Sequence, residues 1–237
     1  MKPEVKIFKD ANAVASAYAE FLRNLQGEKE KLTVSLSGGS TPKLLFDVLA
    51  AEYATSIDWG GLHFFWGDER CVPPDHGESN FKMTKEHLLD HINMPASQVH
   101  RVYGEDDPVQ EAIRYSKELI ANTQSNHGLP SLDLMILGMG DDGHTASIFP
   151  DNMGLLSSTE ICEVANHPDS GQQRVTMTGP VLNNSEIVTF LVTGEKKAQK
   201  VRSILNQEPM AKDFPASHIS GRRLMWFLDE AAASLIQ

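Results

Sequence analysis

Short, largely apolar segments alternate with amphipathic helical segments along the chain, and this alternation limits the possible folds more than any other feature. Five such segments stand out: LTVSL (32–36), LHFFW (62–66), LDLMIL (132–137), EIVTFLVTG (186–194) and LMWFL (224–228). Strands that are apolar on both faces need cover on both sides, as in a parallel sheet between two helix layers. We therefore expect an α/β fold, a doubly wound, mainly parallel sheet with helices on both faces. RVTMT (174–178) is expected to be a further strand.

The segments between these strands carry helix signals. Residues 10–26 predict a helix with Asp10 as its N-cap, and Asp107 followed by Pro108 predicts the start of another. We expect the second helix to bury one face, made of Val109, Ala112, Ile113 and Ser116. No linker, repeat or low-complexity tract interrupts the pattern, so we expect one α/β domain over residues 1–237.

Composition excludes several classes of function. The formal net charge is −11, and such a chain repels nucleic acid and anionic membranes. No segment has the length of a membrane span, and the start MKPEVKIFKD lacks the apolar region of a secretory signal. Cys71 and Cys162 have no C-x-x-C partner, which is typical of a reduced, cytoplasmic protein. The nine histidines show no metal-ligand spacing, so we expect no metal site.

Ligands of doubly wound sheets bind beyond the carboxyl ends of the strands, so the loops that follow strands are the places to search. The first such loop is SGGSTP (37–42). Thr41 is expected to cap the next helix, with Pro42 at its first position. Glycines that allow close approach and free N–H groups at a helix start form a cradle for an anion. An ordinary turn with a helix cap remains the alternative.

Two further loops carry charge. Gly67-Asp68-Glu69-Arg70 follows a strand, and Arg70 can bind phosphate oxygens through a two-pronged contact. Its alternative is a local ion-pair cluster. Gly194-Glu195-Lys196-Lys197 places two lysines in the first turn of a helix, where an anion would be stabilised. A solvated run of charges is the alternative for this loop.

The fourth loop, GMGDDGHTASIFP (138–150), is open to two interpretations. Its glycines spell the G-x-G-x-x-G of dinucleotide-binding loops, but Asp141 and Asp142 would stand where a pyrophosphate must approach. An acid–base site fits better. Imidazole is the side-chain group with an ordinary pKa near neutrality, and an adjacent carboxylate can orient the ring of His144. The alternative for a single histidine is a hydrogen-bonded loop residue. No G-x-S-x-G is present, which disfavours a serine hydrolase.

Taken together, the loops resemble those of the 6-phosphogluconolactonases, within the glucosamine-6-phosphate isomerase/6-phosphogluconolactonase family. The matching stretches span most of the chain in order: LSGGSTP (36–42), FFWGDERCVPPDHGESNF (64–81), LDLMILGMGDDGHTASIFP (132–150), RVTMTGPVLNNS (174–185) and LVTGEKKA (191–198). The isomerase branch has D-E-Y where this chain has Asp68-Glu69-Arg70. It also has N-E-P after its histidine, where this chain reads SIFP (147–150) without a carboxylate. Both differences favour the lactonase branch. One departure is Gly67, where the family commonly has alanine.

The resemblance implies a Rossmann-like fold of the sugar-phosphate isomerase/lactonase type. It also implies hydrolysis of 6-phospho-D-glucono-1,5-lactone to 6-phospho-D-gluconate in the oxidative pentose phosphate pathway, without a metal or an organic cofactor. His144 would then act as the general base, with Asp142 as the residue that orients it. The substrate phosphate would be bound by residues of three loops: Gly39, Ser40, Thr41, Arg70 and Lys197. Lys197, rather than Lys196, matches the lysine of the family's T-G-x-x-K-A pattern.

Three other functions stay open at this point. A sugar-phosphate isomerase or deaminase would share the fold and the phosphate site but needs the missing glutamate. A non-catalytic sugar-phosphate sensor usually carries a basic DNA-binding segment, and none precedes the first strand here. A dinucleotide-dependent oxidoreductase rests on the glycine pattern alone. The expected partner is a small sugar-phosphate lactone, with no nucleic acid and no membrane, and the chain is expected to be a monomer or a homodimer.

Overall fold

A computed structural model describes residues 3–236 of the chain. Its strands are β1 (Glu4–Phe8), β2 (Leu32–Leu36), β3 (Leu62–Trp66), β4 (Asp68–Arg70), β5 (Gln124–Asn126), β6 (Leu129–Ser131), β7 (Leu134–Leu137), β8 (Cys162–Asn166), β9 (Gln173–Met177), β10 (Ile187–Val192) and β11 (Arg223–Asp229). Its α-helices are α1 (Ala11–Gly27), α2 (Ser40–Glu52), α3 (Asn80–His87), α4 (Pro108–Asn122), α5 (Gly179–Asn183) and α6 (Ala198–Leu205). The five apolar segments are strands, as the sequence predicts.

The main sheet has six strands in the order β1-β11-β10-β7-β2-β3, and every neighbouring pair is parallel. This confirms the α/β prediction. The chain runs from β2 to β3 in one direction, and then from β7 through β10 to β11 in the other. The order therefore reverses between β2 and β7. A crevice opens at the carboxyl ends of such a pair, because the helices that follow the two strands diverge.

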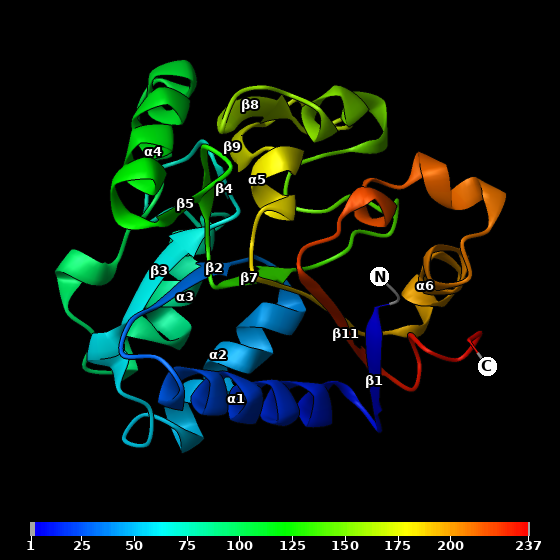
Figure 1. The fold of residues 1–237 in the computed structure, drawn as a ribbon, viewed down its shortest axis with the longest axis horizontal. Coiled ribbons are helices and arrows are strands. Elements are labelled where there is room, and N and C mark those ends of the chain that lie inside the picture. The colour runs from blue at the N-terminus through cyan, green and yellow to red at the C-terminus, as the bar shows by residue number, and fades with distance from the viewer. Residues whose placement is uncertain (1–2, 237) are drawn as a thin grey trace.

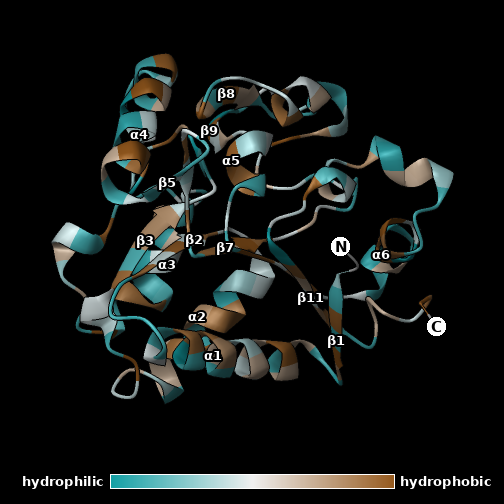
Figure 2. Ribbon diagram, in the orientation of Figure 1, coloured by the Kyte–Doolittle hydropathy of each residue, from teal (hydrophilic) through white to brown (hydrophobic). Residues whose placement is uncertain are grey.

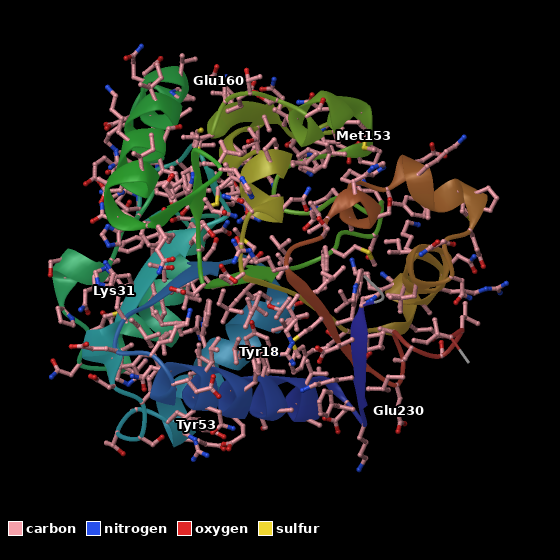
Figure 3. The ribbon with its side chains drawn as sticks, in the orientation of Figure 1. Tyr18, Lys31, Tyr53, Met153, Glu160 and Glu230 are labelled. Carbon is pink, nitrogen blue, oxygen red and sulfur yellow. The ribbon has the colours of Figure 1, made fainter. Side chains whose placement is uncertain are left out.

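Helices cover the sheet on both faces. In the view of Figure 1, α1 and α2 lie below the sheet, and α4 and α5 lie above it. Hydrophobic residues gather on the central strands and on the helix surfaces that meet them (Figure 2). Tyr18 of α1, labelled in Figure 3, is fully buried. Its hydroxyl forms a 2.6 Å hydrogen bond with the hydroxyl of Thr189 in β10. Burial raises the pKa of Tyr18. None of the helices in residues 3–236 is long and apolar enough to cross a membrane.

A second sheet, antiparallel and three-stranded in the order β4-β9-β8, was not expected. Two predictions need correction here. RVTMT (174–178) belongs to this small sheet rather than to the parallel one, and Asp68–Arg70 is a strand rather than a loop. Gly67 joins the two sheets, since its N–H donates to Leu36 O at 3.0 Å and its carbonyl accepts from Met177 N at 2.8 Å. A Cβ at Gly67 would make only ordinary contacts, the nearest at 3.5 Å, so the alanine common in the family would fit.

The buried face of α4 differs from the prediction. The caps are as expected, because Asp107 accepts the backbone N–H of Gln110 and Pro108 is the first helical residue. Val109 and Ile113, however, are 55% and 47% exposed, and Ser116 is half-buried. The face that packs on the protein carries Ala112, as predicted, together with Tyr115 and Leu119. Tyr115 decides the choice, because its hydroxyl accepts from Trp66 N at 2.8 Å and donates to Trp66 O at 3.0 Å, which satisfies backbone groups of the edge strand β3.

Candidate active site

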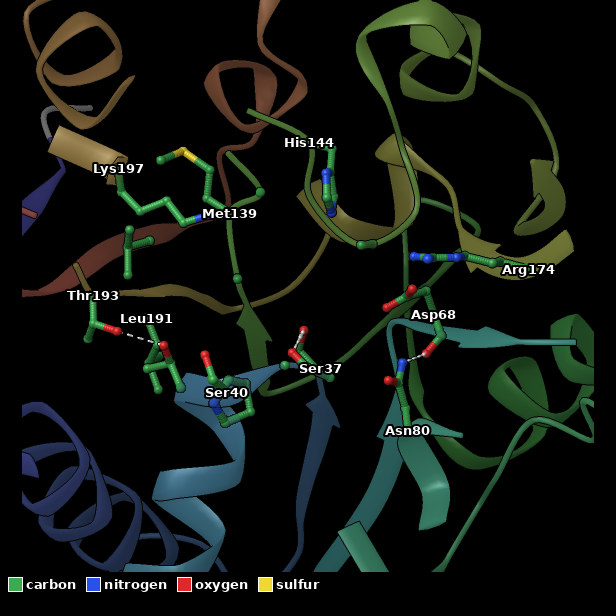
Figure 4. A pocket seen from close by; sticks show the side chains of 18 of the residues that line it. Ser37, Ser40, Asp68, Asn80, Met139, His144, Arg174, Leu191, Thr193 and Lys197 are labelled. Atoms are coloured by element: carbon green, nitrogen blue, oxygen red, sulfur yellow. Dashed lines mark hydrogen bonds between the residues drawn. The ribbon is translucent and has the colours of Figure 1, made fainter. Parts of the chain in front are cut away.

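A pocket of about 240 Å³ lies at the carboxyl ends of β2 and β7, where the strand order reverses. All four loops singled out from the sequence contribute to its lining: Ser37–Pro42, Asp68 and Arg70, Gly138–Gly140 with His144, and Lys197. In the view of Figure 4, Lys197 and Ser40 stand on one side, Arg174 and Asp68 on the other, and His144 between them. The topology thus brings distant loops of the chain into one site.

The first wall is the start of α2. The expected cap is wrong, since Gly39 rather than Thr41 is the N-cap, and Pro42 is the third helical residue. Gly39 has a φ of 105°, a conformation that favours glycine. No side chain caps this helix end, so N–H groups of its first turn are left for a ligand. The hydroxyl of Thr41 forms a 2.9 Å hydrogen bond with the hydroxyl of Thr193, which connects the start of α2 to the segment before Gly194.

Lys197 lies beside this helix start. A 3₁₀ turn, Glu195–Lys197, precedes α6, and Lys197 lines the pocket while Lys196 does not. The side chain of Lys197 is only 19% exposed, and its Nζ forms an ion pair with Asp141, which is 65% exposed. A lysine whose side chain is largely removed from water is stabilised by an anionic partner, and Asp141 supplies one in this structure.

His144 is held by Asp142. Asp142 Oδ1 accepts a 2.6 Å hydrogen bond from the ring Nδ1 and a 3.0 Å hydrogen bond from the backbone N–H of the same histidine. Burial alone would raise the pKa of Asp142, but the hydrogen bonds and charge of His144 lower it to about 2. Asp142 is therefore ionised near neutrality and can only accept, so the proton sits on Nδ1. The lone pair of Nε2 on a neutral ring is then free to take a proton.

Two glycines shape this loop. A Cβ at Gly140 would lie 2.1 Å from His144 Nδ1 and 2.5 Å from Asp142 Oδ1, so only glycine leaves room for the pair. Gly143 has a φ of 90°, and a Cβ there would also collide with Phe214. Phe149 packs against the His144 ring with the centroids 4.7 Å apart. The imidazole is thus fixed by one hydrogen-bond partner and one apolar contact.

The opposite wall contains residues that the sequence prediction missed. Arg174 of β9 lines the pocket although it is only 9% exposed, and desolvation and the neighbouring Arg70 lower its pKa. Asp68 is buried and accepts a 2.6 Å hydrogen bond from Ser147, whose hydroxyl also accepts from Arg174 at 3.4 Å. The only available signal for Arg174 was a charged residue at the start of an otherwise buried strand.

Glu69 has a structural position instead. Its carboxylate accepts hydrogen bonds from the backbone N–H groups of Asn80 and Phe81 at 2.8 and 2.7 Å, at the start of α3. Burial raises the pKa of Glu69 despite these bonds. Asn80 in turn donates to Asp68 O at 3.0 Å and packs so closely on Gly38 that a Cβ there would lie 2.0 Å from its Oδ1. Asn80, also missed, therefore sets the spacing between two pocket walls.

The family model of glucosamine-6-phosphate isomerases/6-phosphogluconolactonases matches residues 9–226. The chain belongs to this family. A 6-phosphogluconolactonase of Treponema pallidum is 43% identical over 198 residues, covering 84% of this chain and 82% of the relative. One of Haemophilus influenzae is 42% identical over 206 residues, covering 86% and 87%. The crystal structure of devB protein superimposes with a TM-score of 0.94 at 40% identity and covers 99% of both chains.

The site residues predicted from the sequence all line the pocket or contact a residue that does. Gly39, Ser40, Thr41, Arg70, His144 and Lys197 line it. Asp142 lies behind His144 and contacts it directly.

Cys71 and Cys162 are free thiols, and burial raises the pKa of Cys162 to about 12. Among the residues that the structure describes, no group of three or more histidine, cysteine or acidic side chains is arranged to hold a metal ion.

Proposed function

We propose that this pocket hydrolyses 6-phospho-D-glucono-1,5-lactone to 6-phospho-D-gluconate, a step of the oxidative pentose phosphate pathway, in the cytoplasm. Relatives that match most of the chain at about 40% identity carry the name 6-phosphogluconolactonase. The observation that carries the proposal is the His144–Asp142 pair, which shares one pocket with an uncapped helix start and Lys197. A base and an anion cradle in one pocket suit a reaction at one end of a phosphorylated sugar.

The phosphate is held at the start of α2. Backbone N–H groups of Gly39, Ser40 and Thr41, the Ser40 hydroxyl, and the cations Arg70 and Lys197 supply the donors. A local cationic site on an acidic protein accounts for an anionic substrate despite the net charge of −11. Binding the remote phosphate orients the lactone ring against His144, which lowers the entropic part of the barrier.

His144 Nε2 takes a proton from water as the water oxygen bonds to the lactone carbonyl carbon. Asp142 stabilises the imidazolium that forms. Backbone N–H groups of a glycine loop that lines the pocket stabilise the oxyanion of the tetrahedral intermediate. The bond between the carbonyl carbon and the ring oxygen then breaks, and the imidazolium returns the proton to that oxygen. One water is consumed, and no electrons are transferred.

The isomerase alternative has less support from the pocket. The glutamate that the isomerase branch places after its histidine is absent here, and Phe149 packs on the His144 ring instead. Asp68 is the buried carboxylate in the pocket, but it is engaged with Ser147 and lies beside Arg174. A carboxylate committed in this way is a poor base for moving protons between carbon atoms.

A coupled assay tests the proposal. Glucose-6-phosphate dehydrogenase generates the lactone, 6-phosphogluconate dehydrogenase reports the product, and a reaction without the protein gives the spontaneous rate. We expect the protein to accelerate product formation, and His144→Ala to lose about 10²–10⁴-fold in kcat. His91→Ala, a histidine outside the pocket, is the matched control. An unchanged kcat in His144→Ala would show that His144 is not the general base. If the wild type does not accelerate the reaction, the protein is not a lactonase.

A further inference from the structure

The ion pair between Asp141 and Lys197 engages a cation that lines the pocket beside the proposed phosphate site. Asp141 is a neighbour of Asp142 in the same loop, yet the two carboxylates do different things. Asp142 holds His144, whereas Asp141 reaches across to Nζ of Lys197 at the end of the Glu195–Lys197 turn. The Thr41–Thr193 hydrogen bond keeps the uncapped start of α2 next to that turn.

The charges make this contact consequential. The side chain of Lys197 is only 19% exposed and lines the pocket, while Asp141, at 65% exposed, can turn toward water at little cost. The hydrogen bond and charge of Lys197 keep the pKa of Asp141 below its usual value. The carboxylate is thus charged wherever a phosphate dianion exists. Lys197 then faces two anions whenever a phosphorylated ligand arrives.

We propose that Asp141 is an internal counter-ion of Lys197 that competes with the phosphate of the ligand, and so limits affinity for phosphorylated substrate and product. In the empty pocket it neutralises Lys197. On binding, the phosphate displaces it, and when the product leaves, Asp141 returns and compensates the ammonium that is left behind. This inference rests on the proposed function, because it assumes that Lys197 receives the phosphate.

Asp141→Asn is the decisive substitution, because it removes the charge and keeps the shape of an exposed side chain. We expect inorganic phosphate and 6-phosphogluconate to bind about two- to tenfold more tightly to this variant, as measured by isothermal titration calorimetry. Asp141→Ala should show the same gain. Asp151→Asn is the matched control, because Asp151 is exposed in the following segment and outside the pocket lining. In a Lys197→Gln background, Asp141→Asn should give no gain.

Each other outcome overturns the inference. Weaker phosphate binding to Asp141→Asn would make Asp141 a residue that positions Lys197, and equal binding would make the ion pair irrelevant to the ligand. An equal gain in phosphate affinity in Asp151→Asn would show that the effect comes from the net charge of the protein and not from the ion pair. The titrations need no turnover, so they separate this inference from the proposed function. A chain without lactonase activity can still show the gain, and an active lactonase can lack it.

Discussion

Arg70 and Arg174 stand opposite each other in the antiparallel ladder of β4 and β9, and both line the pocket. Their Nε atoms are buried, and neither has a hydrogen-bond partner among residues 3–236. Like charges directly opposite on neighbouring strands destabilise a sheet. Asp68 offsets part of this repulsion, and an anionic ligand would offset the rest. We therefore expect this wall to attract a negatively charged group.

Arg70→Ala should lose mainly the affinity that depends on phosphate. Hydrogen bonds to charged groups contribute about 1.5–3 kcal/mol, so we expect KM for the phosphorylated lactone to rise about 10- to 100-fold. The activity toward glucono-1,5-lactone, which lacks the phosphate, should stay near the wild-type level. Steady-state kinetics with both lactones check this. Arg202→Ala is the control, since Arg202 is paired with Glu208 away from the pocket. An equal loss with both lactones would place Arg70 at the reacting centre instead.

Asp142→Asn should lower kcat with little change in KM. The amide keeps the shape but loses the charge that holds the proton on Nδ1 and stabilises the imidazolium. Replacing the carboxylate that holds a catalytic histidine in its tautomer with an amide can cost as much as about 10⁴-fold in kcat. Kinetics give the rate, and nitrogen NMR of the imidazole gives the tautomer. If the tautomer and kcat both stay unchanged, Asp142 is only a structural partner of the loop.

Gly140→Ala and Gly138→Ala form a matched pair. The added Cβ at Gly140 would collide with His144 and Asp142, whereas at Gly138 the nearest atom, Ser37 Oγ, is 4.0 Å away. We expect Gly140→Ala to lose about 10²-fold or more in kcat, because a displacement of about 1 Å in a reacting group can cost that much. Gly138→Ala should remain close to wild type. Circular dichroism confirms folding, and similar kcat values for the two variants would contradict the tight fit.

His63 should make the protein sensitive to moderate acid. Its Nδ1 lies 3.0 Å from His100 Nε2, and His100 Nδ1 lies 2.6 Å from Glu118. Burial, together with Lys31 and His100, lowers the pKa of His63 from 6.5 to about 4. The unfolded chain binds this proton first, so the contribution of His63 to stability is complete above pH 6.5 and is lost as the pH falls toward 4.

The measurement is the urea midpoint as a function of pH. Wild type should lose stability over this window, and His63→Gln, which cannot take up the proton, should show a shallower slope. Asp142 contributes in a lower window, because its pKa of about 2 lies below the ordinary 3.8. Parallel slopes for wild type and His63→Gln would assign the acid sensitivity to other groups.

Sequence patterns among residues close in the chain determined many of the helices and strands of this protein. The strands β2, β3, β7, β10 and β11 follow from short apolar segments, and the start of α4 follows from Asp107 and Pro108, because these signals involve residues close in the chain. The Asp142–His144 contact is also local. The parallel sheet then implies that loops after strands share one edge, which is how the four pocket loops could be chosen from the sequence.

Only the tertiary structure decided the rest. The strand order places the reversal between β2 and β7, and the pairing of β4 with β9 brings Arg174 opposite Arg70. The pairing of two strands that are distant in the chain produces no periodic pattern in either sequence. The place of Arg174 in the pocket therefore could not be predicted from the residues next to it in the sequence. The buried face of α4 also depends on a long-range contact, between Tyr115 and Trp66. The helix has two apolar stripes, and its sequence alone does not show which one packs on the protein.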